Sequence, residues 1–86
     1  MNFKIENNRI FKEDEAGQVI AEITFSETSS GVFVIEHTFV DSSLRGQGIA
    51  SKLVQAVVDE INKRGGQVKA TCSYAAKWLS EHAKDR

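Results

Sequence analysis

A loop containing two glycines marks the point where the hydrophobic pattern first changes from the period of a strand to that of a helix. The segment Val32–Val40 is rich in β-branched and aromatic residues, which is typical of a strand. The segment Gln47–Lys63 repeats its apolar residues at helical spacing. The loop between them reads Arg45-Gly46-Gln47-Gly48-Ile49-Ala50. The chain is therefore constrained to a strand, a short glycine-containing loop and a helix in direct succession.

This loop carries the groups that hold a phosphate. The first amides of a helix have no partner within the helix, and the helix dipole places partial positive charge beside them. Glycine lets the backbone approach a bulky anion and take positive φ angles without penalty. Arg45 adds a permanent charge whose donor geometry matches phosphate oxygens. The loop predicts an anion site, although an ordinary tight turn is the structural alternative.

The remaining segments predict an α+β fold with the order ββββαβα. Strands are expected at Lys4–Glu6, Arg9–Lys12, Val19–Ser26, Val32–Val40 and Gln67–Cys72, helices at Gln47–Lys63 and Tyr74–Ala83, and turns at Asn7-Asn8, Glu13–Gly17 and Glu27–Gly31. The early strands are expected to pair antiparallel, and the strand–helix–strand segment is long enough for a right-handed crossover between parallel strands. The apolar residues of Val32–Val40 fall on both faces, so this strand is expected to be central and covered on each side.

Composition excludes several classes of protein. The 86 residues predict one domain over residues 1–86, and the net charge of −1 arises from scattered charges without the basic stripe of a nucleic-acid-binding protein. No apolar run has the length of a membrane span or of a signal-peptide core, so a cytoplasmic protein is expected. The single cysteine, Cys72, excludes an internal disulfide and a multi-cysteine metal site, and its spacing from His82 does not fit a metal site either.

The Walker A motif and the dinucleotide fingerprint do not fit this loop, because no Gly-Lys-Ser/Thr follows and further spaced glycines are missing. The loop instead resembles the pyrophosphate-binding motif of the GNAT superfamily of acetyl-CoA-dependent acetyltransferases. That motif runs Gln/Arg-x-x-Gly-x-Gly/Ala, which Arg45, Gly48 and Ala50 satisfy. The resemblance to the short, single-domain branch extends from about Phe3 to Trp78 and also rests on the segments Glu36–Val40 and Cys72–Tyr74.

The resemblance implies a CoA or acetyl-CoA cofactor. Its pyrophosphate would lie on residues 45–50, and its pantetheine arm in a cleft where the strands at 32–40 and 67–72 separate. Backbone amides of Phe39 and Val40 would bind the arm like an added strand and polarise the thioester carbonyl. Larger members carry helices after the first strand and further C-terminal strands that shape the acceptor pocket. This chain has no room for them, so CoA binding is better supported than any particular acceptor.

Amine acetylation needs a base for the acceptor and an acid for the leaving thiolate. Glu36 and His37 are adjacent on the expected strand and are therefore expected on opposite faces, with His37 beside Phe33, Ile35 and Phe39. A buried, hydrogen-bonded histidine and a carboxylate paired with a neighbouring strand are the structural alternatives. A glutamate on this strand is the base in some relatives, which favours Glu36.

Two further candidates lie near the last helix. Cys72 is expected to end the fifth strand, where the following helix N-terminus lowers a thiol pKa and favours a nucleophilic thiolate; a small buried apolar side chain is the alternative. Tyr74 is a candidate donor to the CoA sulfur or to the pyrophosphate side of the cofactor, or a half-buried helix residue. Trp78 and Leu79 are expected in the core, and His82 at the surface.

By resemblance, the chain is expected to be a minimal acetyl-CoA-dependent N-acetyltransferase. Direct transfer to the amine is favoured over a route through an acetylated Cys72. The acceptor, whether a small amine, a peptide or a protein lysine, stays open. The alternatives are a CoA-binding module without transferase activity and a small interaction domain. A monomer or a weak homodimer formed through a sheet edge is expected.

Overall fold

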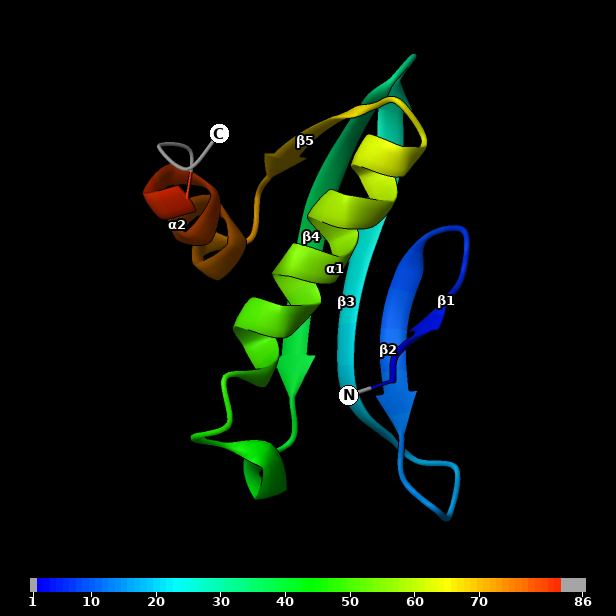
Figure 1. The fold of residues 1–86 in the computed structure, drawn as a ribbon, viewed down its shortest axis with the longest axis vertical. Helices are drawn as coiled ribbons and strands as arrows, with labels where there is room; N and C mark the ends of the chain where they lie inside the picture. The colour runs from blue at the N-terminus through cyan, green and yellow to red at the C-terminus, as the bar shows by residue number, and fades with distance from the viewer. Residues whose placement is uncertain (1, 83–86) are drawn as a thin grey trace.

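The structure is a computed structural model that describes residues 2–82 (Figure 1). In chain order its elements are β1 (Lys4–Ile5), β2 (Arg9–Glu13), β3 (Val19–Ser29), β4 (Val32–Val40), the short 3-10 helix η1 (Ser42–Leu44), α1 (Ile49–Lys63), β5 (Gln67–Ala70) and α2 (Ser73–His82). The order ββββαβα and the α+β class are confirmed. None of the described helices is long and apolar enough to cross a membrane.

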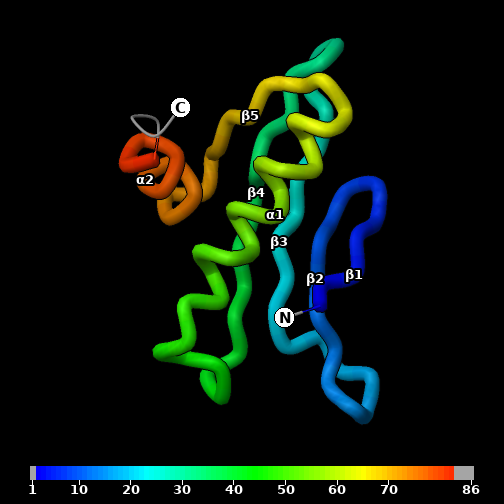
Figure 2. The backbone as a smooth tube through the Cα atoms, in the orientation of Figure 1, coloured from blue at the N-terminus to red at the C-terminus, as the bar shows by residue number. Residues whose placement is uncertain are grey.

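The strands form a single sheet in the order β1-β2-β3-β4-β5. The first three pairings are antiparallel, and β4 pairs with β5 in parallel, as predicted. Helix α1 runs along the sheet and connects the two parallel strands (Figure 2). Its N-terminus therefore lies near the end of β4, and its C-terminus near the start of β5.

The core lies between α1 and one face of the sheet. The helical repeat of α1 is buried at Ile49, Leu53, Val54, Val57, Val58 and Ile61, whereas Ala50 is half-buried. Ile10, Ile23, Phe25 and Ile35 supply the strand side of this core. Ala75 and Trp78 of α2 join the same cluster. Both helices therefore pack on one face of the sheet, and we call the opposite one the outer face.

Several helices and strands begin or end at other residues than predicted, in two cases because a glycine has a positive φ angle. Gly46 and Gly48 have φ angles of 82° and 69°, so Gln47 lies between two left-handed residues and α1 begins only at Ile49. β3 continues to Ser29, because the hairpin needs only Ser30 and Gly31 to turn, with Gly31 at φ 78°. β5 ends at Ala70, before Cys72, and α2 begins at Ser73. The predicted last helical residue, Ala83, lies outside the described residues.

A β-bulge in β4 changes which side chains face the helix. Thr24 pairs with His37 and Phe25 with Ile35, so one step along β3 matches two along β4, and Glu36 has no partner. Ile35 is buried beneath α1, whereas Glu36, His37 and Phe39 are exposed on the outer face. The expectation that Glu36 and His37 lie on opposite faces was wrong. The expected cover on both sides of β4 was also wrong, because no described helix packs on the outer face.

The two parallel strands separate at the level of this bulge. Their pairing ends at Ile35 and Ala70. The amides of Thr71 and Cys72 both donate to the Ile35 carbonyl oxygen, at 3.0 and 3.3 Å, before the chain turns into α2. β5 therefore leaves the second half of β4 with an open edge.

Candidate functional site

The N-terminus of α1 carries free backbone donors. Gly48 is the N-cap of the helix and provides no side chain to cap it. The first helical hydrogen bond runs from the Lys52 amide to the Gly48 carbonyl at 3.1 Å, so the amides of Ile49, Ala50 and Ser51 have no acceptor within the helix. These donors and the positive end of the helix dipole favour an anion.

The turn that precedes this helix is held by its own hydrogen bonds. The Asp41 carboxylate accepts from the Ser43 hydroxyl at 2.6 Å and from the Ser43 amide at 3.0 Å, and these bonds lower the pKa of Asp41. The Arg45 amide donates to the Ser42 carbonyl at 3.2 Å. Within residues 2–82 no carboxylate forms an ion pair with Arg45. The turn thus places Arg45 beside the N-terminus of α1, and within residues 2–82 no carboxylate neutralises the guanidinium charge.

A pocket of about 200 Å³ opens at this point. It is lined by Val40, Leu44, Arg45, Gly46, Gly48, Ile49, Ala50, Ser51 and Tyr74. The structure therefore brings together the end of β4, the glycine loop, the first turn of α1 and a tyrosine from α2. Two of the predicted cofactor-binding residues, Phe39 and Gln47, do not line this pocket. Ser51, which the sequence analysis did not single out, does.

The open edge of β4 presents alternate backbone groups. The Asp41 amide donates to the Ile20 carbonyl on β3 at 2.8 Å, and in an antiparallel ladder every second residue bonds the same neighbour. The Phe39 amide is therefore directed toward β3, whereas the amides of Thr38 and Val40 are directed toward the open edge. The Val40 amide is thus at the open edge, as expected, but the Phe39 amide is not, because neighbouring residues of a strand direct their amides to opposite edges and the bulge turns Phe39 toward β3.

Cys72 lies beside this edge and caps α2. Its carbonyl accepts from the Ala76 amide at 2.9 Å, and its Sγ lies 3.6 Å from Thr38 Oγ1. Burial opposes ionisation of the thiol, but hydrogen bonds from the amides of Ala75 and Tyr74 and from Thr38 outweigh it and lower its pKa. The half-buried sulfur is thus an acceptor at a helix N-terminus.

Glu36 and His37 lie on the outer face where β5 leaves β4. Glu36 is exposed, and its Oε2 accepts from the Ser26 hydroxyl on β3 at 3.0 Å. His37 is also exposed, so it is not a buried core histidine. Phe39, on the same face, is 40% exposed. This surface is open to an incoming acceptor, and nothing in residues 2–82 folds over it as a lid.

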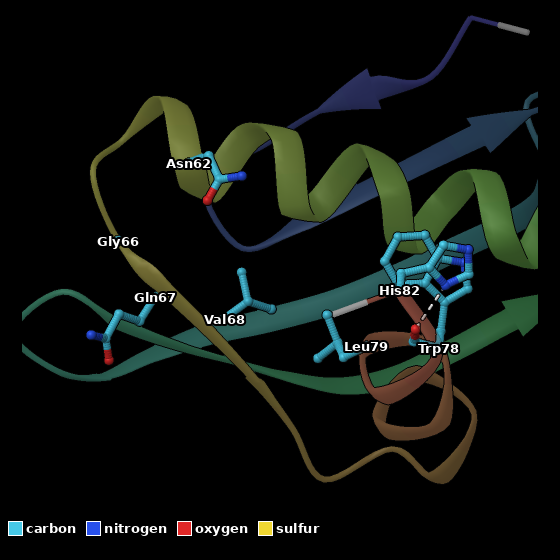
Figure 3. A pocket seen from close by; sticks show the side chains of 7 residues that line it. All are labelled: Asn62, Gly66, Gln67, Val68, Trp78, Leu79 and His82. Atoms are coloured by element: carbon cyan, nitrogen blue, oxygen red, sulfur yellow. Dashed lines mark hydrogen bonds between the residues drawn. The ribbon is translucent and has the colours of Figure 1, made fainter. Parts of the chain in front are cut away.

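A second pocket, of about 420 Å³, lies at the other end of α1 (Figure 3). It is lined by Asn62, Gly66, Gln67, Val68, Trp78, Leu79 and His82. It contains no lysine, arginine or helix N-terminus, so it is less suited to a phosphate than the smaller pocket. Among residues 2–82, no three metal-ligating side chains gather into a metal site.

Comparison with known proteins identifies the family. Residues 9–86 match the family described as GCN5-related N-acetyltransferase, and the chain belongs to this family. An NMR structure of a GCN5-like protein from Staphylococcus aureus is 30% identical, covers 96% of this chain and superposes with a TM-score of 0.78. The GNAT family N-acetyltransferase YhbS from Escherichia coli, solved in complex with CoA, is 30% identical over 67% of this chain, with a TM-score of 0.60. No curated protein sequence matched.

The relatives differ in length. The chain spans 81% of the S. aureus protein but only 35% of the E. coli one. An acetyltransferase from Bacillus cereus, 19% identical with a TM-score of 0.69, shares the fold, and the chain spans 54% of it. CoA binding is a property found within the family, because the E. coli protein was solved in complex with CoA.

Proposed function

We propose that the protein binds acetyl-CoA and transfers the acetyl group to an amine. The observation that carries this proposal is the pocket at the N-terminus of α1, where Arg45, the free amides of α1 and Tyr74 converge. This pocket lies at Val40, the residue at which the open edge of β4 ends. Family membership and the CoA complex of a relative support the same cofactor.

The geometry suggests a path for the cofactor. The pyrophosphate binds the amides of residues 46–50 and the Arg45 guanidinium, and the Tyr74 hydroxyl donates to the same end of the cofactor. The pantetheine arm extends along the edge of β4 and bonds the amides directed there, those of Thr38 and Val40. The thioester then lies near the bulge, where fixed backbone donors polarise its carbonyl. The amine nitrogen forms a bond to the acetyl carbon and the C–S bond breaks, so that CoA leaves as the thiolate, and Glu36 accepts the proton of the amine.

Titration of the ¹⁵N-labelled protein with CoA tests the binding step. We expect the amide resonances of residues 46–51, with those of Thr38 and Val40, to shift together in proportion to site occupancy. The amide of Gly65, at the opposite end of α1, serves as an internal control and should stay in place. An unchanged spectrum at millimolar CoA, or shifts confined to the pocket beside Trp78, would refute the proposed site.

Direct transfer from acetyl-CoA to the amine is the mechanism we propose, with Cys72 as a cap of α2. Replacing the sulfur by a hydroxyl in Cys72→Ser keeps an acceptor for the helix amides, so turnover should persist. Cys72→Ala removes the acceptor and should cost about 1 kcal/mol of unfolding free energy, measured by denaturation, without abolishing turnover. Intact-mass measurement after mixing with acetyl-CoA alone checks the mechanism. A stoichiometric acetyl adduct, absent from Cys72→Ala and consumed by an added amine, would establish the ping-pong route instead.

A CoA-binding module without transferase activity is the second candidate. It is favoured by the open outer face, because no element within residues 2–82 forms an acceptor pocket around Glu36 and His37. The two functions share the cofactor site and differ in turnover. Release of free CoA thiol in the presence of small amines and lysine-containing peptides supports the transferase, whereas tight binding without release in any of these assays supports the module.

A further inference from the structure

The fifth strand leaves one edge of the sheet without a partner strand among residues 2–82. β5 is the last strand of the sheet and pairs only with β4. The amides of Gln67 and Thr71 donate to carbonyl oxygens on the β4 side of the strand, at 2.6 and 3.0 Å. Alternate residues of a strand direct their backbone groups to opposite edges, so those of Val68 and Ala70 are directed away from β4. Their N–H and C=O groups form a template for an added strand.

The cavity of about 420 Å³ lies on the helix-covered face of this same strand. Val68 pairs with the buried Phe33, so its side chain is on that face. Figure 3 shows Asn62 of α1, Val68 of β5 and Leu79 of α2 on three sides of the cavity. Val68 and Leu79 are half-buried, and among residues 2–82 no lysine, arginine, aspartate or glutamate lines the cavity. Its volume is within the range of about 300–1,000 Å³ that ligand sites occupy. The cavity therefore fits a bulky apolar group.

Helix α2 forms the outer wall of this cavity and is held in place by its tryptophan. Trp78 Nε1 donates to Ser51 Oγ on α1 at 2.8 Å, and the residue is only 6% exposed. The His82 ring stacks on the indole at a centroid distance of 3.8 Å. In Figure 1, α2 lies to the left of β5, whereas β4 lies to its right. Because α2 packs in the helix layer, the position next to β5 in the plane of the sheet is not filled by any strand of residues 2–82.

The charge and size of the side chains on β5 indicate which partner fits this edge. Lys69 lies between Val68 and Ala70, so its exposed side chain projects from the outer face. Within residues 2–82 no carboxylate forms an ion pair with it. A second copy of the chain is a poor fit, because a pairing centred on Lys69 sets two like charges opposite each other. The β5 strand of a second copy would also bring only valine and alanine to the cavity.

We propose that the free edge of β5 is a docking site for an extended segment of a different protein. The segment pairs with β5 as a sixth strand, and its backbone bonds the free groups of Val68 and Ala70. One bulky apolar side chain of the segment enters the cavity between α1 and α2, and an acidic side chain lies opposite Lys69 on the outer face. The cofactor pocket lies at the other end of α1, so partner and CoA bind to separate surfaces.

Selection from a phage-displayed library of random linear peptides against the immobilised protein tests this inference. We expect enriched peptides in which apolar and polar residues alternate and which carry one acidic and one bulky apolar residue. These two residues should be an odd number of positions apart, because they point to opposite faces of the added strand. An enriched peptide should shift the amide resonances of Val68 and Ala70 and the indole resonance of Trp78 in the ¹⁵N-labelled protein. The amide of Gly48, at the other end of α1, serves as the internal control.

Two variants isolate the backbone and the charge of the edge. Val68→Pro removes a donor that is directed away from β4, so the pairing with β4 stays complete. It should lower the affinity for an enriched peptide by about 10-fold or more in isothermal titration. Lys69→Glu leaves the backbone unchanged, and selection against it should enrich basic residues in place of acidic ones. Ser80→Ala removes an exposed hydroxyl of α2 outside the cavity and should bind the peptide as the wild type does.

Several results would overturn the inference. If no sequence is enriched on the wild type, or if enriched peptides shift amides other than those of β5 and α2, the free edge of β5 is not a docking site. Unchanged peptide affinity in folded Val68→Pro leads to the same conclusion. If Val68→Pro does not fold, Lys69→Glu decides, and enrichment of the same acidic peptides on this variant refutes the proposed pairing. If sedimentation shows a dimer of the wild type that Val68→Pro or Lys69→Glu abolishes, the edge takes a second copy and not a different protein.

Discussion

Gly48→Val is expected to reduce CoA affinity by roughly 100-fold or more, which corresponds to about 2.7 kcal/mol. Gly48 is the N-cap of α1 in the left-handed region, at φ 69° and ψ 24°. A Cβ built there meets no protein atom within 4 Å, so it projects into open space. In the proposed complex the phosphate must approach through this space. A branched side chain blocks that approach, and its strain at positive φ also displaces the free amides.

Isothermal titration of CoA into Gly48→Val and into a second variant with the same backbone strain separates the loss of binding from the loss of stability. Gly65 has a φ of 79° and equally empty surroundings, but it lies beyond the C-terminus of α1. Gly65→Val should therefore lose stability by a similar mechanism while it retains CoA affinity. Circular dichroism establishes that both variants are folded. Equal CoA affinity in folded Gly48→Val and Gly65→Val would show that the pyrophosphate binds elsewhere.

Local pattern was enough to predict most of the fold. The alternation over Val19–Ser26 and the helical repeat over Gln47–Lys63 identified their elements, because each is set by contacts with a single buried face. The position of the glycine loop was also predictable from local sequence, because Gly46 and Gly48 take φ angles that few other residues tolerate. Glu60 and Arg64 form an ion pair at 2.8 Å on α1, and such an i,i+4 contact is also set by local helix geometry.

The features that sequence reasoning missed depend on partners distant in the chain. The bulge at Glu36 is a mismatch in length between two strands, and alternation within β4 alone does not reveal it. That bulge moved His37 and Phe39 to the outer face and turned the Thr38 amide toward the open edge. The bond between Ser51 and Trp78 joins residues 27 positions apart. Trp78 was correctly predicted in the core, but the hydrogen-bond partner of its indole Nε1 can be identified only when α2 is placed against α1.

Glu36→Gln is expected to lower the acetylation rate by about 100- to 10,000-fold, the usual contribution of general base catalysis. The bulge places the carboxylate on the exposed outer face, where an amine can reach it, and the Ser26 hydroxyl holds its Oε2 at 3.0 Å. Glutamine keeps the size and the bond to Ser26 but cannot accept the proton. Glu36 does not line the cofactor pocket, so CoA affinity should stay unchanged. A loss in kcat without a loss in CoA binding identifies a group that acts on the acceptor.

His37→Gln provides the matched control for this prediction. His37 is exposed on the same face and is the next residue in the chain, so its replacement perturbs the same surface. If Glu36 is the base, His37→Gln should retain most of the activity and respond to pH as the wild type does. Steady-state rates with one amine at saturating acetyl-CoA compare the two variants directly. An unchanged rate in Glu36→Gln together with a large loss in His37→Gln would assign the proton transfer to the histidine. Full activity in both variants would require a water or a residue of the acceptor to take the proton.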